Sequence, residues 1–158
     1  MLSAKLKSKS IFLLYPSEKE KYIKEIKKRL EGKAYGFKKV YIMRYEKQKA
    51  TDPTLAHKFD TIYKKSKFVF AFFFKDLTNV SVNFEIGFIH GKECHKFNTK
   101  LQVLSEKGVD FAQDNPYLSS GKGINILVAD FKEKFTESDE HYDPCQLIHS
   151  FVVVNSDK

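Results

Sequence analysis

Short apolar runs alternate along the chain with longer segments in which apolar residues recur at helical spacing. The run at residues 11–15 is closed by Pro16, and an amphipathic pattern among lysines and glutamates then extends to Gly32. A strand followed by a helix is expected there. The same order repeats in a second strand over residues 40–45 and a helix that starts at Asp52-Pro53.

Residues 68–74 differ from the earlier runs because they are apolar without interruption. A strand with one solvated face would alternate polar and apolar residues, whereas a parallel strand covered by helices on both faces is apolar throughout. We therefore place this strand in the middle of the sheet. Beyond it, a third helix is expected over residues 82–91, a fourth strand over 100–104 and a fifth strand over 124–128.

The alternation of strands and helices predicts one α/β domain spanning residues 1–158. Right-handed crossovers would give a doubly wound, mostly parallel five-stranded sheet with helices on both faces. Its core is expected at about residues 10–130, followed by a C-terminal extension. In that extension Asp143-Pro144 indicates a helix start, whereas residues 152–154 suit an edge strand. The pattern leaves both possibilities open.

Composition narrows the class of protein. The 158 residues are 42% hydrophobic, enough to fold as one domain without disulfide support. No apolar run exceeds residues 68–74, and crossing a bilayer takes about 20 apolar residues. The apolar run at residues 11–15 is too short for the core of a signal peptide. Two cysteines cannot form a disulfide framework, so we expect a cytoplasmic protein without a membrane partner.

Positive charge is concentrated near the N-terminus. The formal net charge is +8, and residues 1–50 hold 15 Lys and Arg against five Glu. Such a region favours the phosphates of a nucleotide or a nucleic acid. The lysines are scattered along the chain without interleaved stacking residues, however, which is more typical of a solvated helix face. Nucleic-acid binding is therefore ranked last among the functions considered.

Ligands of open α/β sheets bind beyond the carboxyl ends of the strands, where the winding reverses. The stretch at residues 75–85 falls there, and it contains Glu85 within an apolar helix start. With Ser81 as N-cap, the helix N-terminus would favour the ionised carboxylate while its apolar neighbours limit hydration. Such a group is suited to act as a nucleophile or to stabilise an oxocarbenium ion. Glu85 accepting backbone amide hydrogen bonds is the alternative interpretation.

The residues around Glu85 carry a family resemblance. Residues 83–92, Asn-Phe-Glu-Ile-Gly-Phe-Ile-His-Gly-Lys, resemble the Asn-Val-x-Phe-Glu-Leu-Gly-Tyr-x-x-Gly-Lys stretch of TIR-like nucleotide-binding proteins. They resemble more loosely the Glu-Leu-Gly-Tyr-Ala motif of nucleoside 2-deoxyribosyltransferases. That second motif has Asp six residues before its Glu, where this chain has Asn79. The TIR-like resemblance extends over about residues 10–128.

The resemblance implies a flavodoxin-like fold and a catalytic role for Glu85 in splitting the N-glycosidic bond of NAD or a nucleoside. It also implies self-association, because TIR-type sites are often completed by a neighbouring molecule, and by analogy a role in defence signalling. Two alternatives remain. One is a nucleoside 2-deoxyribosyltransferase or nucleotide N-glycosidase, and the other is a non-catalytic nucleotide-sensing or adaptor module.

On this interpretation NAD or a related nucleotide is the substrate, and no cofactor is expected. Backbone amides would bind phosphate, basic side chains would supply charge, and aromatic rings would stack on a base. The residues predicted to contact the ligand are Tyr15, Ser17, Arg44, Phe74, Lys75 and Asn83. Gly87 and Gly91 would let their helix approach a ligand or another backbone closely. No metal site is predicted, because His90, Cys94 and His95 lack a second pair of ligands at zinc spacing.

Overall fold

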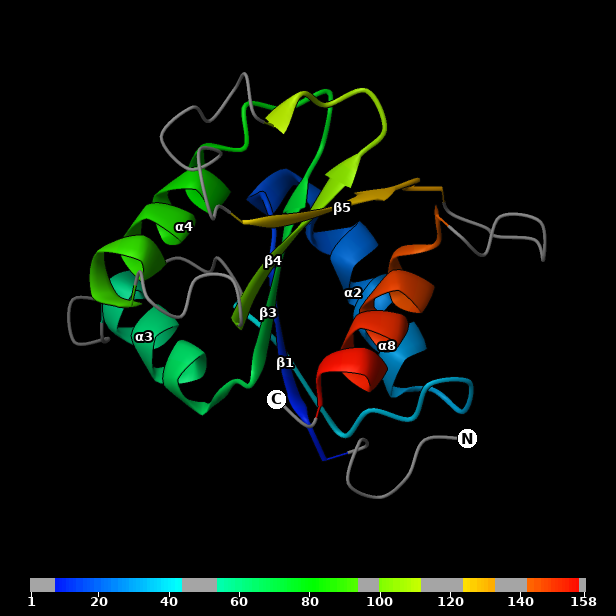
Figure 1. The fold of residues 1–158 in the computed structure, drawn as a ribbon. Coiled ribbons are helices and arrows are strands. Elements are labelled where there is room, and N and C mark those ends of the chain that lie inside the picture. Colours follow the sequence, from blue (N-terminus) through cyan, green and yellow to red (C-terminus); the bar gives the residue numbers. More distant parts are fainter. Residues whose placement is uncertain (1–7, 44–53, 94–99, 112–123, 133–141, 157–158) are drawn as a thin grey trace.

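Strands and helices alternate along the part of the chain that the computed structural model describes, namely residues 8–43, 54–93, 100–111, 124–132 and 142–156 (Figure 1). The strands are β1 (Ser10–Leu14), β2 (Lys39–Ile42), β3 (Phe68–Phe73), β4 (Leu101–Glu106) and β5 (Asn125–Ala129). The helical elements are the short η1 (Ser17–Lys19), α2 (Glu20–Glu31), α3 (Leu55–Lys65), α4 (Val80–Glu93) and α8 (Pro144–Asn155). The five predicted strands are confirmed, with ends that shift by at most three residues.

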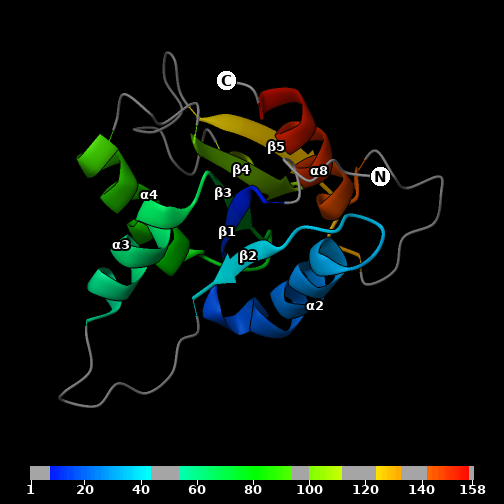
Figure 2. The same cartoon turned by 90° about the horizontal axis from the view of Figure 1, so that it is seen from below.

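The five strands form one parallel sheet in the order β2-β1-β3-β4-β5. The winding reverses between β1 and β3, which pair directly, with Ile11 opposite Phe68. Helices α2 and α8 cover one face of the sheet, and α3 and α4 cover the other (Figures 1 and 2). The predicted doubly wound α/β fold with flavodoxin-like topology is confirmed.

Strand β3 lies at the centre of the sheet, as its unbroken apolar run predicts. Alternate side chains enter the two cores: Phe70 and Phe72 pack towards α2 and α8, whereas Ala71 and Phe73 pack towards α3 and α4. Every residue of β3 is buried. A polar residue at any of these positions would lose its hydration without gaining a partner, which explains why the run contains none.

The C-terminal segment is a helix, so the alternative of an edge strand at residues 152–154 is wrong. Asp143 caps α8 by accepting a hydrogen bond from the Cys145 backbone N–H (3.0 Å), and Pro144 occupies the first helical position. Ile148 and Val152 belong to the core shared with α2. The core therefore extends beyond residue 130, and α8 is part of it rather than an appendage.

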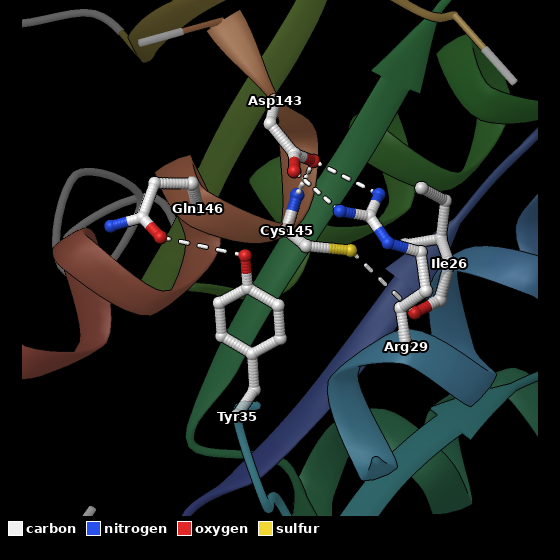
Figure 3. Close-up of polar contacts among 6 residues, drawn as sticks. All are labelled: Ile26, Arg29, Tyr35, Asp143, Cys145 and Gln146. Carbon is white, nitrogen blue, oxygen red and sulfur yellow. Dashed lines mark hydrogen bonds and ion pairs between the residues drawn. The ribbon is translucent and has the colours of Figure 1, made fainter. Parts of the chain in front are cut away.

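A polar cluster joins α8 to α2 (Figure 3). The Arg29 guanidinium donates through Nη1 to Asp143 Oδ1 (3.0 Å) and through Nη2 to the second carboxylate oxygen. The Cys145 thiol lies 3.8 Å from the Ile26 carbonyl oxygen. Burial raises the pKa of this thiol to about 12. The sulfur therefore acts as a neutral core group.

Helix α3 begins after Thr54, whose side chain accepts a hydrogen bond from the His57 backbone N–H (3.1 Å). The predicted start at Asp52-Pro53 and the end of the second predicted strand, residues 44–45, lie outside the described residues. Among the helices of the described part of the chain, none is both long enough and apolar enough to cross a membrane.

Candidate functional site

The loop between β3 and α4 is held by the buried side chain of Asn79. Its Oδ1 accepts from the Phe74 backbone N–H (3.1 Å), and its Nδ2 donates to the carbonyl oxygens of Phe74 (3.0 Å) and Leu77 (2.9 Å). Asn79 also adopts a φ of 53°, a left-handed conformation that asparagine tolerates better than most residues. Helix α4 consequently begins at Val80, and Ser81 lies inside it. The prediction that Ser81 is the N-cap is wrong.

Replacing Asn79 by Asp is expected to lower the free energy of unfolding by about 1–3 kcal/mol. A carboxylate cannot donate to the two carbonyl oxygens and would face them with a negative charge. Urea unfolding at pH 7, followed by circular dichroism, measures the loss. Asn79→Gly is the control, because it keeps the left-handed backbone accessible while removing the side-chain hydrogen bonds. An Asp variant as stable as the natural chain would contradict this role.

Glu85 lies in the wall of a cavity of about 170 Å³ between α3 and α4. Met43, which directly follows β2, the start of α3 and residues 81–88 of α4 surround it at the carboxyl end of the sheet. Glu85 is 6% exposed. It is the only ionisable residue among those described in the lining. The full lining comprises Met43, Leu55, Ala56, Phe59, Ser81, Phe84, Glu85 and Phe88.

Aromatic rings line much of the wall of this cavity. Phe59 and Phe88 meet edge to face with their centroids 5.6 Å apart. Phe84 is 69% exposed, so its ring is available to a molecule that enters from solvent. The residues contributed by α4 stand three or four positions apart and therefore share one face of that helix. The arrangement is a carboxylate set among flat apolar surfaces.

Two acidic residues are buried in the described part of the chain, and their surroundings differ. Asp143 caps α8 and pairs with Arg29, which accounts for its burial. Glu85 borders a cavity. It is the sixth residue of α4, beyond the first turn, so the helix N-terminus favours its charge less than it would favour a carboxylate in the first turn.

The aromatic residues predicted to stack on a ligand lie in the core on the opposite face of the sheet. Tyr15 is 1% exposed, and its hydroxyl donates to the Met43 carbonyl oxygen (2.7 Å). The Phe74 ring packs against Phe131 with centroids 4.6 Å apart. Neither ring lines the cavity beside Glu85, because strand alternation turns both side chains towards α2 and α8. Tyr15 nevertheless supports the cavity by fixing the backbone of Met43.

The other predicted contacts are dispersed. Ser17 and Lys75 are exposed near the carboxyl ends of β1 and β3, and neither lines the cavity. Asn83 is two residues from Glu85, about 200° around the helix, so it points to the other side of α4. Its Oδ1 is buried without a hydrogen-bond partner among the described residues. Arg44 lies outside the described residues.

The two helical glycines do not mark a close approach. A Cβ built on Gly87 or Gly91 would meet no described atom within 4 Å outside the nearby backbone of its own helix. The prediction that α4 closely approaches another backbone at these positions is therefore wrong for the described part of the molecule, whereas a close approach to a ligand stays a prediction. Both glycines lie on the exposed side of α4, where they pack against nothing described.

The structure offers no metal centre within its described ranges, where no three His, Cys, Asp or Glu side chains gather. His90 is exposed on α4, and Cys94 and His95 fall outside those ranges. No protein-family model matches the chain, and no curated protein sequence matches it either.

Proposed function

We propose that this protein binds NAD or a related nucleotide and cleaves its N-glycosidic bond with Glu85 as the catalytic carboxylate. The observation that carries the proposal is the burial of Glu85 in the wall of a largely apolar cavity at the carboxyl end of the sheet. Ligands of open α/β sheets bind at that end. The resemblance of residues 83–92 to TIR-like proteins supports the same role.

The chemistry follows from the charge that develops as the bond breaks. Departure of the base leaves positive charge on the anomeric carbon, and a carboxylate beside that carbon stabilises it or bonds to it. Apolar walls exclude water, so the attraction is stronger than in solution. Water or an internal hydroxyl then takes the place of the base, which gives hydrolysis or cyclisation.

The dimensions of the cavity limit what enters it. Sites for drug-sized ligands occupy about 300–1,000 Å³, and this cavity measures about 170 Å³. One ring would fill it, while the rest of a dinucleotide would lie outside. Phe59 and Phe88 offer faces and edges to such a ring. Because TIR-type sites are often completed by a neighbouring molecule, we also propose that self-association supplies further contacts.

Incubating concentrated protein with NAD, NADP and a panel of nucleosides, followed by chromatography, tests the proposal. Free base is expected from at least one compound, and release per molecule should rise with protein concentration if association completes the site. Base from nucleosides alone would favour the nucleoside N-glycosidase or transferase alternative. A compound that raises the thermal midpoint without being consumed would favour the sensor alternative. The absence of both turnover and a shift of the thermal midpoint would contradict a nucleotide site.

A further inference from the structure

A basic groove of about 730 Å³ runs between α2 and the edge strand β2. The two elements lie side by side in Figure 2. Five lysines line the groove: Lys24, Lys27 and Lys28 come from α2, Lys39 is the first residue of β2, and Lys38 directly precedes it. These residues look scattered in the sequence because a turn separates the two groups. Folding brings them around one concave surface.

Few carboxylates offset this charge. Glu31 is the only acid among the described residues of the lining, and it pairs with Lys27 (2.6 Å). Lys24 lies 3.5 Å from Glu20. The remaining lysines of the groove, Lys28, Lys38 and Lys39, are exposed and form no ion pair with any described residue. A concave surface with an excess of one charge concentrates the field and attracts oppositely charged molecules.

Protection of the sheet edge explains only part of this pattern. Lysines on an edge strand discourage pairing with another strand, which accounts for Lys38 and Lys39. It does not account for three more lysines on a helix that already covers the sheet. An added peptide strand would also need pockets for alternate side chains, yet β2 has four residues and its Val40 is buried.

We propose that the α2–β2 groove binds the phosphate backbone of a nucleic acid. A repeating row of phosphates requires a track of cations and no shaped pockets, and the groove provides that track. Nucleic-acid binding ranks last on the sequence alone because the lysines look scattered there. In the folded chain five of them converge on one groove, which favours nucleic-acid binding. The groove shares no residue with the cavity beside Glu85, so this proposal is independent of the proposed function.

The test compares two variants with the same loss of charge. K28Q/K38Q/K39Q removes the three groove lysines that have no described ion pair. K64Q/K92Q/K107Q removes three lysines elsewhere, of which Lys64 and Lys92 pair with Asp60. Fluorescence anisotropy would measure binding of a labelled 20-nucleotide single strand and a 20-base-pair duplex from 50 to 200 mM salt. Thermal midpoints would verify that both variants are folded.

The groove variant is expected to bind at least tenfold more weakly at 50 mM salt. Its log–log salt slope should be shallower by about 2 for the single strand and about 3 for the duplex. The control variant should bind like the natural chain, and the tighter of the two oligonucleotides identifies the form bound. Equal weakening of both variants, no binding at 50 mM salt, or tighter binding of poly-glutamate would each overturn the proposal.

Discussion

Replacing Glu85 by Gln is expected to slow base release from the substrate by roughly 10³-fold or more. Glutamine has nearly the same shape as glutamate and fills the same wall of the cavity, but it carries no negative charge to stabilise the anomeric cation. The thermal midpoint should stay nearly unchanged, because glutamine has nearly the same volume and opens no space in the core. Chromatographic assay of free base, alongside calorimetry, measures the two quantities.

Ser81→Ala is the matched control for Glu85→Gln. Ser81 lines the same cavity from one turn earlier on α4, but its hydroxyl cannot supply charge. Its loss should change turnover by less than about tenfold. If Glu85→Gln turned over substrate within a few-fold of the natural chain, the catalytic assignment would be lost. A large drop in its thermal midpoint would show that Glu85 is a structural residue instead.

Replacing Asp143 by Ala is expected to destabilise the protein by about 2–4 kcal/mol. The alanine removes the cap of α8 and leaves the half-buried Arg29 guanidinium without its carboxylate. Urea unfolding at pH 7 measures the total effect. Asp143→Ser keeps a capping oxygen but cannot reach Arg29. Its stability should therefore fall between those of the natural chain and the Ala variant. A loss of unfolding free energy below about 0.5 kcal/mol for the Ala variant would contradict the stabilising role of Asp143.

In a Cys94→Ser background, labelling of Cys145 measures how firmly Asp143 and Arg29 hold α8 in place. Its thiol is fully buried, and burial raises the thiol pKa to about 12, so the protonated form predominates in the folded protein at pH 8. Labelling by a disulfide reagent therefore requires α8 to open. For a destabilisation of 2 kcal/mol, Asp143→Ala should label about 30-fold faster. Unchanged labelling would mean that α8 is held by other contacts.

Local patterns sufficed for most of the fold. The apolar run of β3 requires cover on two faces, so its central position follows from composition alone. The secondary structure of the C-terminal segment was harder to predict, because Val152 to Val154 have high strand propensity. The cap at Asp143 and the packing of Val152 against α2 outweigh that propensity, and the second of these is a tertiary contact.

The candidate site was only partly predictable. Glu85 stands out because a carboxylate interrupts an apolar helix start. Leu55 and Phe59, which complete its cavity, look like any apolar stripe until α3 is placed beside α4. The wrong prediction that Tyr15 and Phe74 contact the ligand has a similar cause. The end of a strand indicates which edge of the sheet a residue occupies, but not which layer of helices its ring enters.

The pairing of β1 with β3 also sets the order in which the nascent chain folds. Every neighbour in this sheet is parallel, so no hairpin can form early, and Ile11 must wait for Phe68. Ribosomes add about 5–20 residues per second. For several seconds the apolar first strand has only α2 and β2 as partners, and its other face stays open to solvent. Chaperones that bind exposed apolar segments are expected to engage the chain during that interval.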